Sequence, residues 1–333
     1  MTTIDTERSA AWSAAVLSTC GQASDSCRDV TIDGAQLEAV ADWMCFEVFP
    51  SVGDDRDDPE RPSATDVADA IDFVLVTTSI NFAYTDFDTK VPWSIPHEGR
   101  ELVDADGMFL RFEQAIASGT PATSGPWLAA VTEEELGAIL HGPRPIPMLA
   151  ERVAVLNQIG QILVERYDGR FANFVADCPI AAYADGAGLL ERLVAEFPSF
   201  DDGGDLHGVA VRFDKLAQLS MWTLHRLGLV TLDDVDSLSV FADYIVPAAL
   251  RVMRVLHYSP ELGAAVDAGE IVPAGSDWEH EIRCQTVVAC GLITDALNAR
   301  RSEPVSNAQV DYRFWAAFHD LIRPHHLTIT THY

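Results

Sequence analysis

The fold is decided by residues 276–293, which read Ser-Asp-Trp-Glu-His-Glu-Ile-Arg-Cys-Gln-Thr-Val-Val-Ala-Cys-Gly-Leu-Ile. The stretch opens on a serine followed three residues later by a glutamate, the capping-box pattern of a helix N-terminus. Apolar or small residues then recur at spacings of three and four, at Ile282, Thr286, Ala289 and Ile293. This is the period of one helix face, so the stretch predicts a helix.

The same two signals recur along the chain. Capping boxes are also read at Asp33-Gly-Ala-Gln36 and Thr132-Glu-Glu-Glu135. Helical stripes pass through Leu149, Val153, Leu156, Ile159 and Leu163, and through Phe213, Leu216, Leu219, Thr223 and Leu227, with Gly228 placed to end the second helix. Only residues 70–84 and the tail at 327–331 have a composition that is also compatible with a strand. We expect a mainly α fold with at most a short β element.

Size and composition fit a folded protein. The chain has 333 residues, of which 48% are hydrophobic, enough to bury a substantial core. We expect a single compact domain over residues 1–333, and two helical lobes around a cleft are the alternative. Residues 53–63 are charged and proline-bearing, and predict an acidic surface loop.

Charge limits the partners. With 51 acidic against 22 basic residues the formal net charge is −29, which repels polymeric nucleic acid and the anionic face of a membrane. A single small phosphate remains compatible, because a local Lys or Arg overcomes the net field at short range. The opening residues lack a basic leader followed by an apolar run, and no apolar window would span a bilayer. We therefore expect a small-molecule substrate and a cytoplasmic location; the sequence carries no signal for an oligomeric state.

Several common catalytic and cofactor motifs are absent from the sequence. It contains no phosphate loop, no dinucleotide-binding glycine motif, no nucleophile elbow and no zinc-protease motif. The tightest histidine cluster, His325-His326 with His332, is interpreted as a polar tail packing on the body. The six cysteines are scattered and are expected to be reduced, mostly buried thiols. We expect neither a metal nor an organic cofactor.

One carboxylate interrupts an apolar segment that leads into a helix, Phe241-Ala-Asp-Tyr-Ile-Val-Pro247. Pro247 suits the first helical position and disfavours the α region for Val246, so Asp243 is expected on an extended approach to the helix. Either Asp243 caps or balances the helix terminus, or it is held in a partly dry pocket where its charge acts on a substrate.

Polar groups in apolar surroundings mark four C-terminal segments: Phe213–Gln218, Phe241–Tyr244, Asp277–Arg283 and Asp311–Trp315. Each has a simple structural explanation. Lys215 would be a solvated helix residue, Glu281 and Arg283 a set of surface charges, and the aromatic residues after Asp311 ordinary core. Together, however, the four segments indicate a site.

In this order and with these separations the segments resemble the queuosine salvage family, the queuosine 5′-phosphate N-glycosylases. The resemblance runs roughly from Ala70 to the end. Besides the four segments it includes Ile80-Asn-Phe-Ala-Tyr84, Glu151-Arg-Val153, Phe197-Pro-Ser-Phe200 and a tail ending in Tyr333. It implies a helical enzyme, similar in architecture to helical DNA glycosylases, that hydrolyses the N-glycosidic bond of queuosine 5′-monophosphate without a metal or organic cofactor and releases queuine and ribose 5-phosphate.

The resemblance also implies roles for residues. Asp243 would act as nucleophile or stabilise the transition state, Phe241 would contact the base, and Asp311 would hydrogen-bond it. Lys215, Tyr244, Glu281 and Arg283 complete the candidate substrate-binding set. Two positions depart from the family pattern: Ala316 stands where relatives have an acid, and Gly107-Met108 where a Gly-aromatic pair is expected.

The chemistry suits these residue types. Breaking a ribosyl C–N bond develops positive charge on the sugar, which a carboxylate such as Asp243 stabilises if it remains ionised. Lys215 either opposes the rise in the pKa of Asp243 on burial or binds the 5′-phosphate. Trp222 and Trp315 either cover the heterocycle or belong to the core. Another modified nucleoside as substrate, and an inactive nucleobase-binding module, are the alternatives; the net charge opposes DNA repair.

Overall fold

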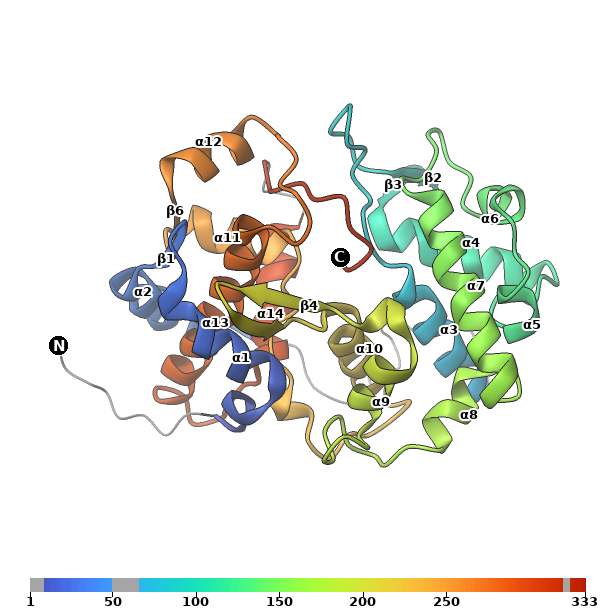
Figure 1. The fold of residues 1–333 in the computed structure, drawn as a ribbon, viewed down its shortest axis with the longest axis horizontal. Coiled ribbons are helices and arrows are strands. Elements are labelled where there is room, and N and C mark those ends of the chain that lie inside the picture. Colours follow the sequence, from blue (N-terminus) through green and yellow to red (C-terminus); the bar gives the residue numbers. More distant parts are fainter. Residues whose placement is uncertain (1–8, 50–65, 320–323) are drawn as a thin grey trace. The chain divides into compact units, whose positions relative to one another are not determined.

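A computed structural model describes residues 9–49, 66–319 and 324–333 (Figure 1). Within them the fold is mainly α, as the sequence predicts, with fourteen α-helices and six strands of three or four residues. No helix in these ranges has the length and apolar character needed to cross a bilayer. The loop expected at 53–63 lies outside the described residues.

The chain divides into two compact units. The first comprises residues 1–51, 202–218 and 234–329, and the second comprises 52–201, 219–233 and 330–333. Helix α10 (Lys215–Arg226) begins in the first unit and ends in the second. The first unit otherwise contains α1 (Ala15–Ala23), β1 (Val30–Ile32), α2 (Gly34–Met44), β4 (Gly203–Leu206), β5 (Val209–Arg212), α11 (Ile245–Val252), β6 (Leu256–Tyr258), α12 (Pro260–Asp267), α13 (Asp277–Asn298) and α14 (Asn307–Phe318). The second contains α3 (Val67–Ser79), β2 (Ser94–His97), β3 (Arg100–Val103), α4 (Asp104–Ala117), α5 (Gly125–Leu128), α6 (Glu133–Ile139), α7 (Leu149–Arg166), α8 (Phe171–Ala176) and α9 (Leu189–Glu196).

Helix α13 forms the centre of the first unit. It packs against α1, α2, α11, α14 and β1, and Figure 1 shows it among these elements. Residues on all its faces are buried, including the charged Glu281 and Arg283 as well as the predicted apolar stripe. A helix buried all round must satisfy its polar side chains internally, so these two charges need partners within the unit.

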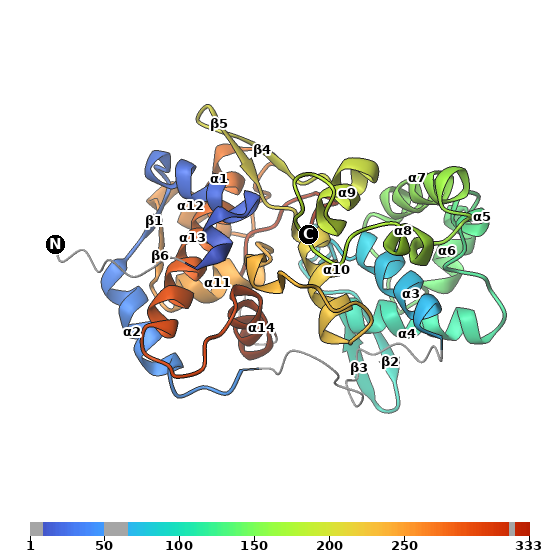
Figure 2. The same cartoon turned by 90° about the horizontal axis from the view of Figure 1, so that it is seen from below.

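Helix α7 has the corresponding place in the second unit, where it packs against α5, α6 and α3 (Figure 2). Its predicted stripe is confirmed, because Val153, Leu156, Ile159 and Leu163 are buried. Gly160 allows the closest approach: a Cβ atom there would lie 2.1 Å from the backbone N of Ala129 at the end of α5.

The β structure consists of three antiparallel pairs. β1 pairs with β6, with Thr31 opposite His257; β2 and β3 form a hairpin; and β4 and β5 form another, which lies beside α1 (Figure 2). Residues 70–84, left open by the sequence, are helical as far as Ser79. The tail makes only one isolated bridge, between Leu327 and Ile271.

The three predicted helix starts are present, but only the start at Thr132 has both hydrogen bonds of a capping box. Thr132 and Glu135 form the complete capping box, and Asp33 Oδ1 accepts from the N–H groups of Ala35 and Gln36. Ser276 accepts from the N–H of Glu279, but the Glu279 carboxylate accepts from the N–H of Gly275 and lies 3.6 Å from Arg283. The glutamate thus contributes to the ion pairs of the core as well as to the helix start.

The expected start of α11 was wrong by two residues. The helix begins at Ile245, so Val246 is helical and Pro247 is its third residue. Asp243 Oδ1 accepts from the N–H groups of Ile245 at 2.8 Å and Val246 at 3.2 Å, which stabilises this earlier start. Proline is tolerated there because the first-turn N–H groups have no partner within the helix.

Substitution of Gly160 by alanine tests the packing of α7. The new Cβ would meet backbone atoms that cannot move aside, so we expect Gly160→Ala to lower the free energy of unfolding by about 3 kcal/mol. Gly34→Ala is the control, because a Cβ at that helix position meets nothing within 4 Å. Thermal and denaturant unfolding of both variants would measure the difference; equal stabilities would contradict the close packing.

Candidate functional site

The candidate site is built around residues 238–243, an irregular segment between η4 (Val235–Ser237) and α11. Leu238 to Ala242 are buried, yet no strand supplies partners for their backbone. Buried N–H and C=O groups must be hydrogen-bonded, and here side chains from α10, α13 and α14 perform that function. Four such side chains fix the segment at successive positions: Asn307, Gln218, Asp311 and Arg283.

Gln218 and Asp311 hold the first half of the segment. Gln218 Oε1 accepts from the N–H of Ser239 at 2.8 Å, while its Nε2 donates to Ser239 Oγ and to the carbonyl of Phe213. Asp311 Oδ1 accepts from the N–H of Phe241 at 2.8 Å. The Phe241 carbonyl in turn accepts from the N–H of Asp243 at 2.7 Å, which makes a tight turn over Ala242.

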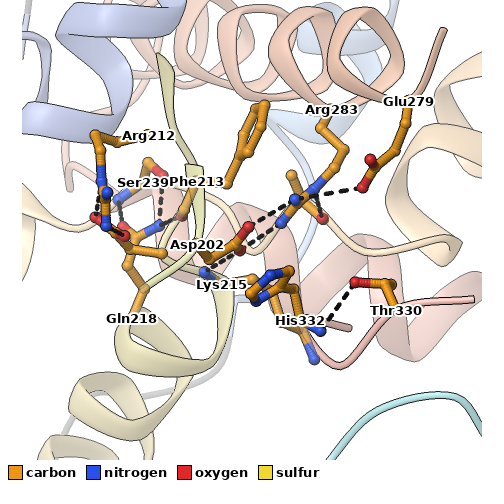
Figure 3. Close-up of polar contacts among 12 residues, drawn as sticks. Asp202, Arg212, Phe213, Lys215, Gln218, Ser239, Glu279, Arg283, Thr330 and His332 are labelled. Carbon is orange, nitrogen blue, oxygen red and sulfur yellow. Dashed lines mark hydrogen bonds and ion pairs between the residues drawn. The ribbon is translucent and has the colours of Figure 1, made fainter. Parts of the chain in front are cut away.

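Arg283 holds the second half. Its Nε donates to the carbonyl of Ala242 at 3.0 Å, and its two terminal nitrogens donate to the carboxylate of Asp202 at 2.8 and 2.6 Å (Figure 3). The guanidinium carbon lies 4.1 Å from the centre of the Phe213 ring. Asp202 and Arg283 are 2% and 1% exposed, so this is a bidentate ion pair in the core rather than a surface charge set.

Asp202 also contacts the start of α10. Its Oδ2 accepts from the backbone N–H of Lys215 at 3.1 Å, and its carbonyl accepts from the N–H groups of Phe213 and Asp214. Lys215 is only 7% exposed, which excludes the alternative that it is a solvated helix residue. Its burial follows from its position, because its own N–H donates to a buried carboxylate and the two N–H groups before it donate to the backbone carbonyl of the same residue.

Three ionisable groups meet beside this segment. Burial lowers the pKa of Lys215, and the negative charges of Asp243, Asp311 and Asp202 oppose that change. Burial raises the pKa of Asp243, whereas Lys215, the two capping N–H groups and His319 favour its charged form. Burial and the charge of Asp243 raise the pKa of Asp311 well above its usual range. The hydrogen bond from the N–H of Phe241 and the charge of Lys215 oppose this rise.

Asp243 therefore has the capping function that was one of the two alternatives, and its action on a substrate remains a prediction. It caps α11, and it also lies in a desolvated environment beside a lysine. Each capping N–H stabilises the anion, so the helix start and Lys215 act in the same direction on its charge.

The ring of Tyr244 stacks on His325 of the tail, with centroids 4.4 Å apart and planes 24° from parallel. His325 and His326 are both buried, in agreement with a tail that packs on the body. Burial, with the charges of His325 and Arg283, lowers the pKa of His326 to about 3, so this imidazole is neutral at ordinary pH. Within the described ranges no group of three His, Cys, Asp or Glu side chains is placed to hold a metal ion.

Glu281 faces a different part of the first unit. Its carboxylate accepts from the N–H groups of Arg28, Asp29 and Val30 at 2.6–2.9 Å, and lies 2.9 Å from His207 Nε2. The side chain is fully buried, which excludes the alternative that Glu281 belongs to a set of surface charges. Its bonds give it a structural function, to hold the chain ahead of β1; a contact with substrate remains a prediction.

Of the candidate residues, the structure brings together Lys215, Asp243, Asp311, Phe241 and Arg283. Tyr244 follows Asp243 in the chain, and Glu281 faces another part of the first unit.

Trp222 is buried, Trp315 is half-buried beside Tyr312 and His319, and Ala316 is exposed on α14. Met108 is buried and its sulfur accepts from the hydroxyl of Tyr84. Sequence reasoning missed Asp202; the one available signal was that a buried arginine on α13 needs a carboxylate.

Two carboxyl groups with raised pKa values beside one buried cation are suited to hydrolysis of a glycosidic bond, which needs one ionised carboxylate and one group that keeps its proton. A family model described as queuosine salvage protein matches residues 61–333. The chain belongs to this family.

Curated relatives agree with that membership. A protein from Sphaerobacter thermophilus is 32% identical over 268 residues, which are 78% of this chain and 80% of the relative. A protein from Bos taurus is 29% identical over 88% of this chain and 89% of its own length, and one from Mus musculus is 29% identical over 77% and 78%. All three are named queuosine 5′-phosphate N-glycosylase/hydrolase.

Glu281→Gln distinguishes a structural from a substrate-binding function. The amide keeps the shape but not the charge that four N–H···O contacts use, so we expect the free energy of unfolding to fall by about 3 kcal/mol while the KM of the folded enzyme stays the same. Denaturant unfolding and steady-state kinetics measure the two quantities. Asp277→Asn, on the exposed start of the same helix, is the control and should change stability by less than about 0.5 kcal/mol. A raised KM at unchanged stability would make Glu281 a substrate residue.

Proposed function

We propose that this protein hydrolyses the N-glycosidic bond of queuosine 5′-monophosphate and releases queuine and ribose 5-phosphate. The observation that carries the proposal is a capped, desolvated carboxylate, Asp243, beside the buried cation Lys215 in a chain that belongs to the queuosine salvage family. The names of the curated relatives support the same substrate. A cytoplasmic location and independence of metals and organic cofactors remain predictions.

Asp243 is given the reacting role. As the C–N bond breaks, positive charge develops on C1′ of the ribose, and a fixed carboxylate stabilises that charge more in the transition state than in the ground state. Both capping hydrogen bonds go to Oδ1, so Oδ2 is the oxygen that would face the sugar. From there it either stabilises the cation or bonds to C1′, and water completes the hydrolysis.

Asp311 is given the complementary role of a neutral acid. More groups stabilise the anion of Asp243 than that of Asp311, and the charge of Asp243 itself raises the pKa of Asp311. Carboxyl groups whose surroundings separate their pKa values divide the acid and base functions between them. A protonated Asp311 would donate a hydrogen bond to the heterocycle while its other oxygen holds the N–H of Phe241, whose ring would cover the base.

Lys215 is assigned to tuning the charge of Asp243. It is one of two lysines among the 22 basic residues of the chain, and its ammonium favours the ionised form of Asp243 directly. A compact ammonium on a flexible stem responds to burial more readily than a guanidinium. The alternative, a contact with the 5′-phosphate, makes a different kinetic prediction.

Asp243→Asn tests the central claim. The amide oxygen can still cap α11, so the variant should remain folded while it loses the charge that faces the sugar, and kcat should fall by a factor of about 10² or more. Chromatography of queuine released from queuosine 5′-monophosphate measures this rate. Asp33→Asn is the matched control, because Asp33 also accepts from the N–H groups two and three residues after it, at the start of α2. Wild-type turnover in Asp243→Asn would remove Asp243 from the mechanism. If the wild-type protein binds queuine but does not cleave the nucleotide, it is a binding module.

Lys215→Gln tests the assignment of the lysine. The rate requires ionised Asp243 and therefore falls as the pH falls through the pKa of Asp243. Loss of the ammonium raises that pKa, so we expect the acid limb of kcat/KM to move to higher pH with both the nucleotide and the nucleoside queuosine. Lys90→Gln, an exposed lysine, should leave the profile unchanged. A raised KM confined to the nucleotide, with no shift of the limb, would instead identify Lys215 as a phosphate ligand.

A further inference from the structure

We propose that Asp202 is a positioning residue, which fixes the catalytic carboxylate of Asp243 by orienting Arg283. The inference rests on the proposed function and extends it to a residue that acts through another side chain. Asp202 lies ahead of β4, 41 positions before Asp243 in the sequence, and the guanidinium of Arg283 links it to the segment that carries Asp243.

Asp202 determines the plane of the guanidinium. A bidentate carboxylate fixes both the position and the rotation of an arginine fork, whereas a single contact fixes neither. The Phe213 ring covers one face of the guanidinium at 4.1 Å, so little freedom remains outside that plane. With two of its nitrogens bound to Asp202, the third, Nε, is directed to the carbonyl of Ala242 at 3.0 Å.

The Ala242 carbonyl belongs to the peptide group that carries Asp243. Asp311 fixes the peptide between residues 240 and 241 by accepting from the N–H of Phe241. The N–H of Asp243, which lies in the same peptide as the Ala242 carbonyl, donates to the backbone carbonyl of Phe241. Arg283 is therefore the side chain that sets the orientation of the peptide between residues 242 and 243. A rotation of this peptide would displace the carboxylate relative to the sugar, and misplacement by about 1 Å costs on the order of 10²-fold in rate.

Asp202 also reaches the cation of the site. Its Oδ2 accepts from the backbone N–H of Lys215, the residue at which α10 begins. One carboxylate thus fixes the backbone that carries Lys215 and, through Arg283, the backbone that carries Asp243. This dual function explains why a buried ion pair, which by itself adds little to stability, occupies this position.

Asp202→Asn tests the inference. The amide is the same size but cannot accept both guanidinium bonds, so we expect kcat to fall by about 10–100-fold. The KM for queuosine 5′-monophosphate and the Kd for free queuine should change by less than about threefold, because the groups that contact the base remain in place. Asp201→Asn is the control, a neighbouring exposed aspartate whose replacement should leave all three constants within about twofold of wild type.

Two kinetic results for Asp202→Asn would overturn the inference. One is a folded Asp202→Asn variant with kcat within twofold of wild type; the other is a kcat loss matched by an equal loss of queuine binding, which marks a collapsed site rather than a displaced carboxylate. If Asp202→Asn does not fold, the double variant Asp202→Asn with Arg283→Gln removes both charges and leaves no unpaired guanidinium. It should fold and show the same kcat loss, and wild-type kcat in it would overturn the inference.

Wild-type turnover in the same assay separates the two claims. If the wild-type protein does not release queuine, the proposed function fails, whereas an active wild type with a fully active Asp202→Asn removes only the positioning function. A crystal structure of Asp202→Asn supplies a readout independent of turnover. We expect the Ala242 carbonyl to be rotated away from Arg283 in it, and an unchanged peptide would also overturn the inference.

Discussion

The ion pair between Arg283 and Asp202 is the constraint on which the first unit depends. It joins the central helix α13, the start of α10 and the segment that carries Asp243, three parts of the chain that are far apart in sequence. Removal of one member would leave a buried charge without a partner, which costs several kcal/mol, so neither residue is free to change alone. The pair acts mainly by fixing geometry, because Arg283 holds the segment at residues 238–243, which has no strand partner.

The electrostatics of the site differ from those of the protein as a whole. A chain with a net charge of −29 would disfavour any further anion, yet Asp243 lies where a lysine, two N–H groups and a histidine all favour its charge. Burial raises the pKa of Asp243, and these local contributions oppose that rise at short distance, where the long-range field of the other charges is screened. A strongly negative net charge is therefore compatible with the ionised Asp243 that the proposed function requires.

The helical fold could be predicted from the sequence because its signals are local. The capping residues at Thr132 and Asp33 and the apolar period of α7 depend on neighbours within four positions, and the structure has them. The buried charges could not be predicted in this way. The sequence around Glu281 is compatible with a surface position, because its partners, the N–H groups of residues 28–30, are distant in the chain. Asp202, which binds Arg283, belongs to no local motif.

The prediction for α11 failed for a related reason. Proline statistics placed the helix start at Pro247, but the side chain of Asp243 stabilised a start two residues earlier. The candidate site was found because a family resemblance linked four segments that spacing alone does not connect. What the resemblance could not give was the network that holds these segments, since it is made of side-chain contacts to backbone groups.

The contacts of Glu281 have a consequence for where the first unit begins. The family match starts at residue 61, but this glutamate, within the match, binds the backbone of residues 28–30, and α13 is covered by α1 and α2 from the same N-terminal region. Residues between Ala11 and Met44 are thus part of the hydrophobic core of the first unit. A chain trimmed to the matched boundary would expose the apolar surface of α13 and leave the glutamate carboxylate buried without its N–H donors, so the boundary of the family match understates the minimal folding unit.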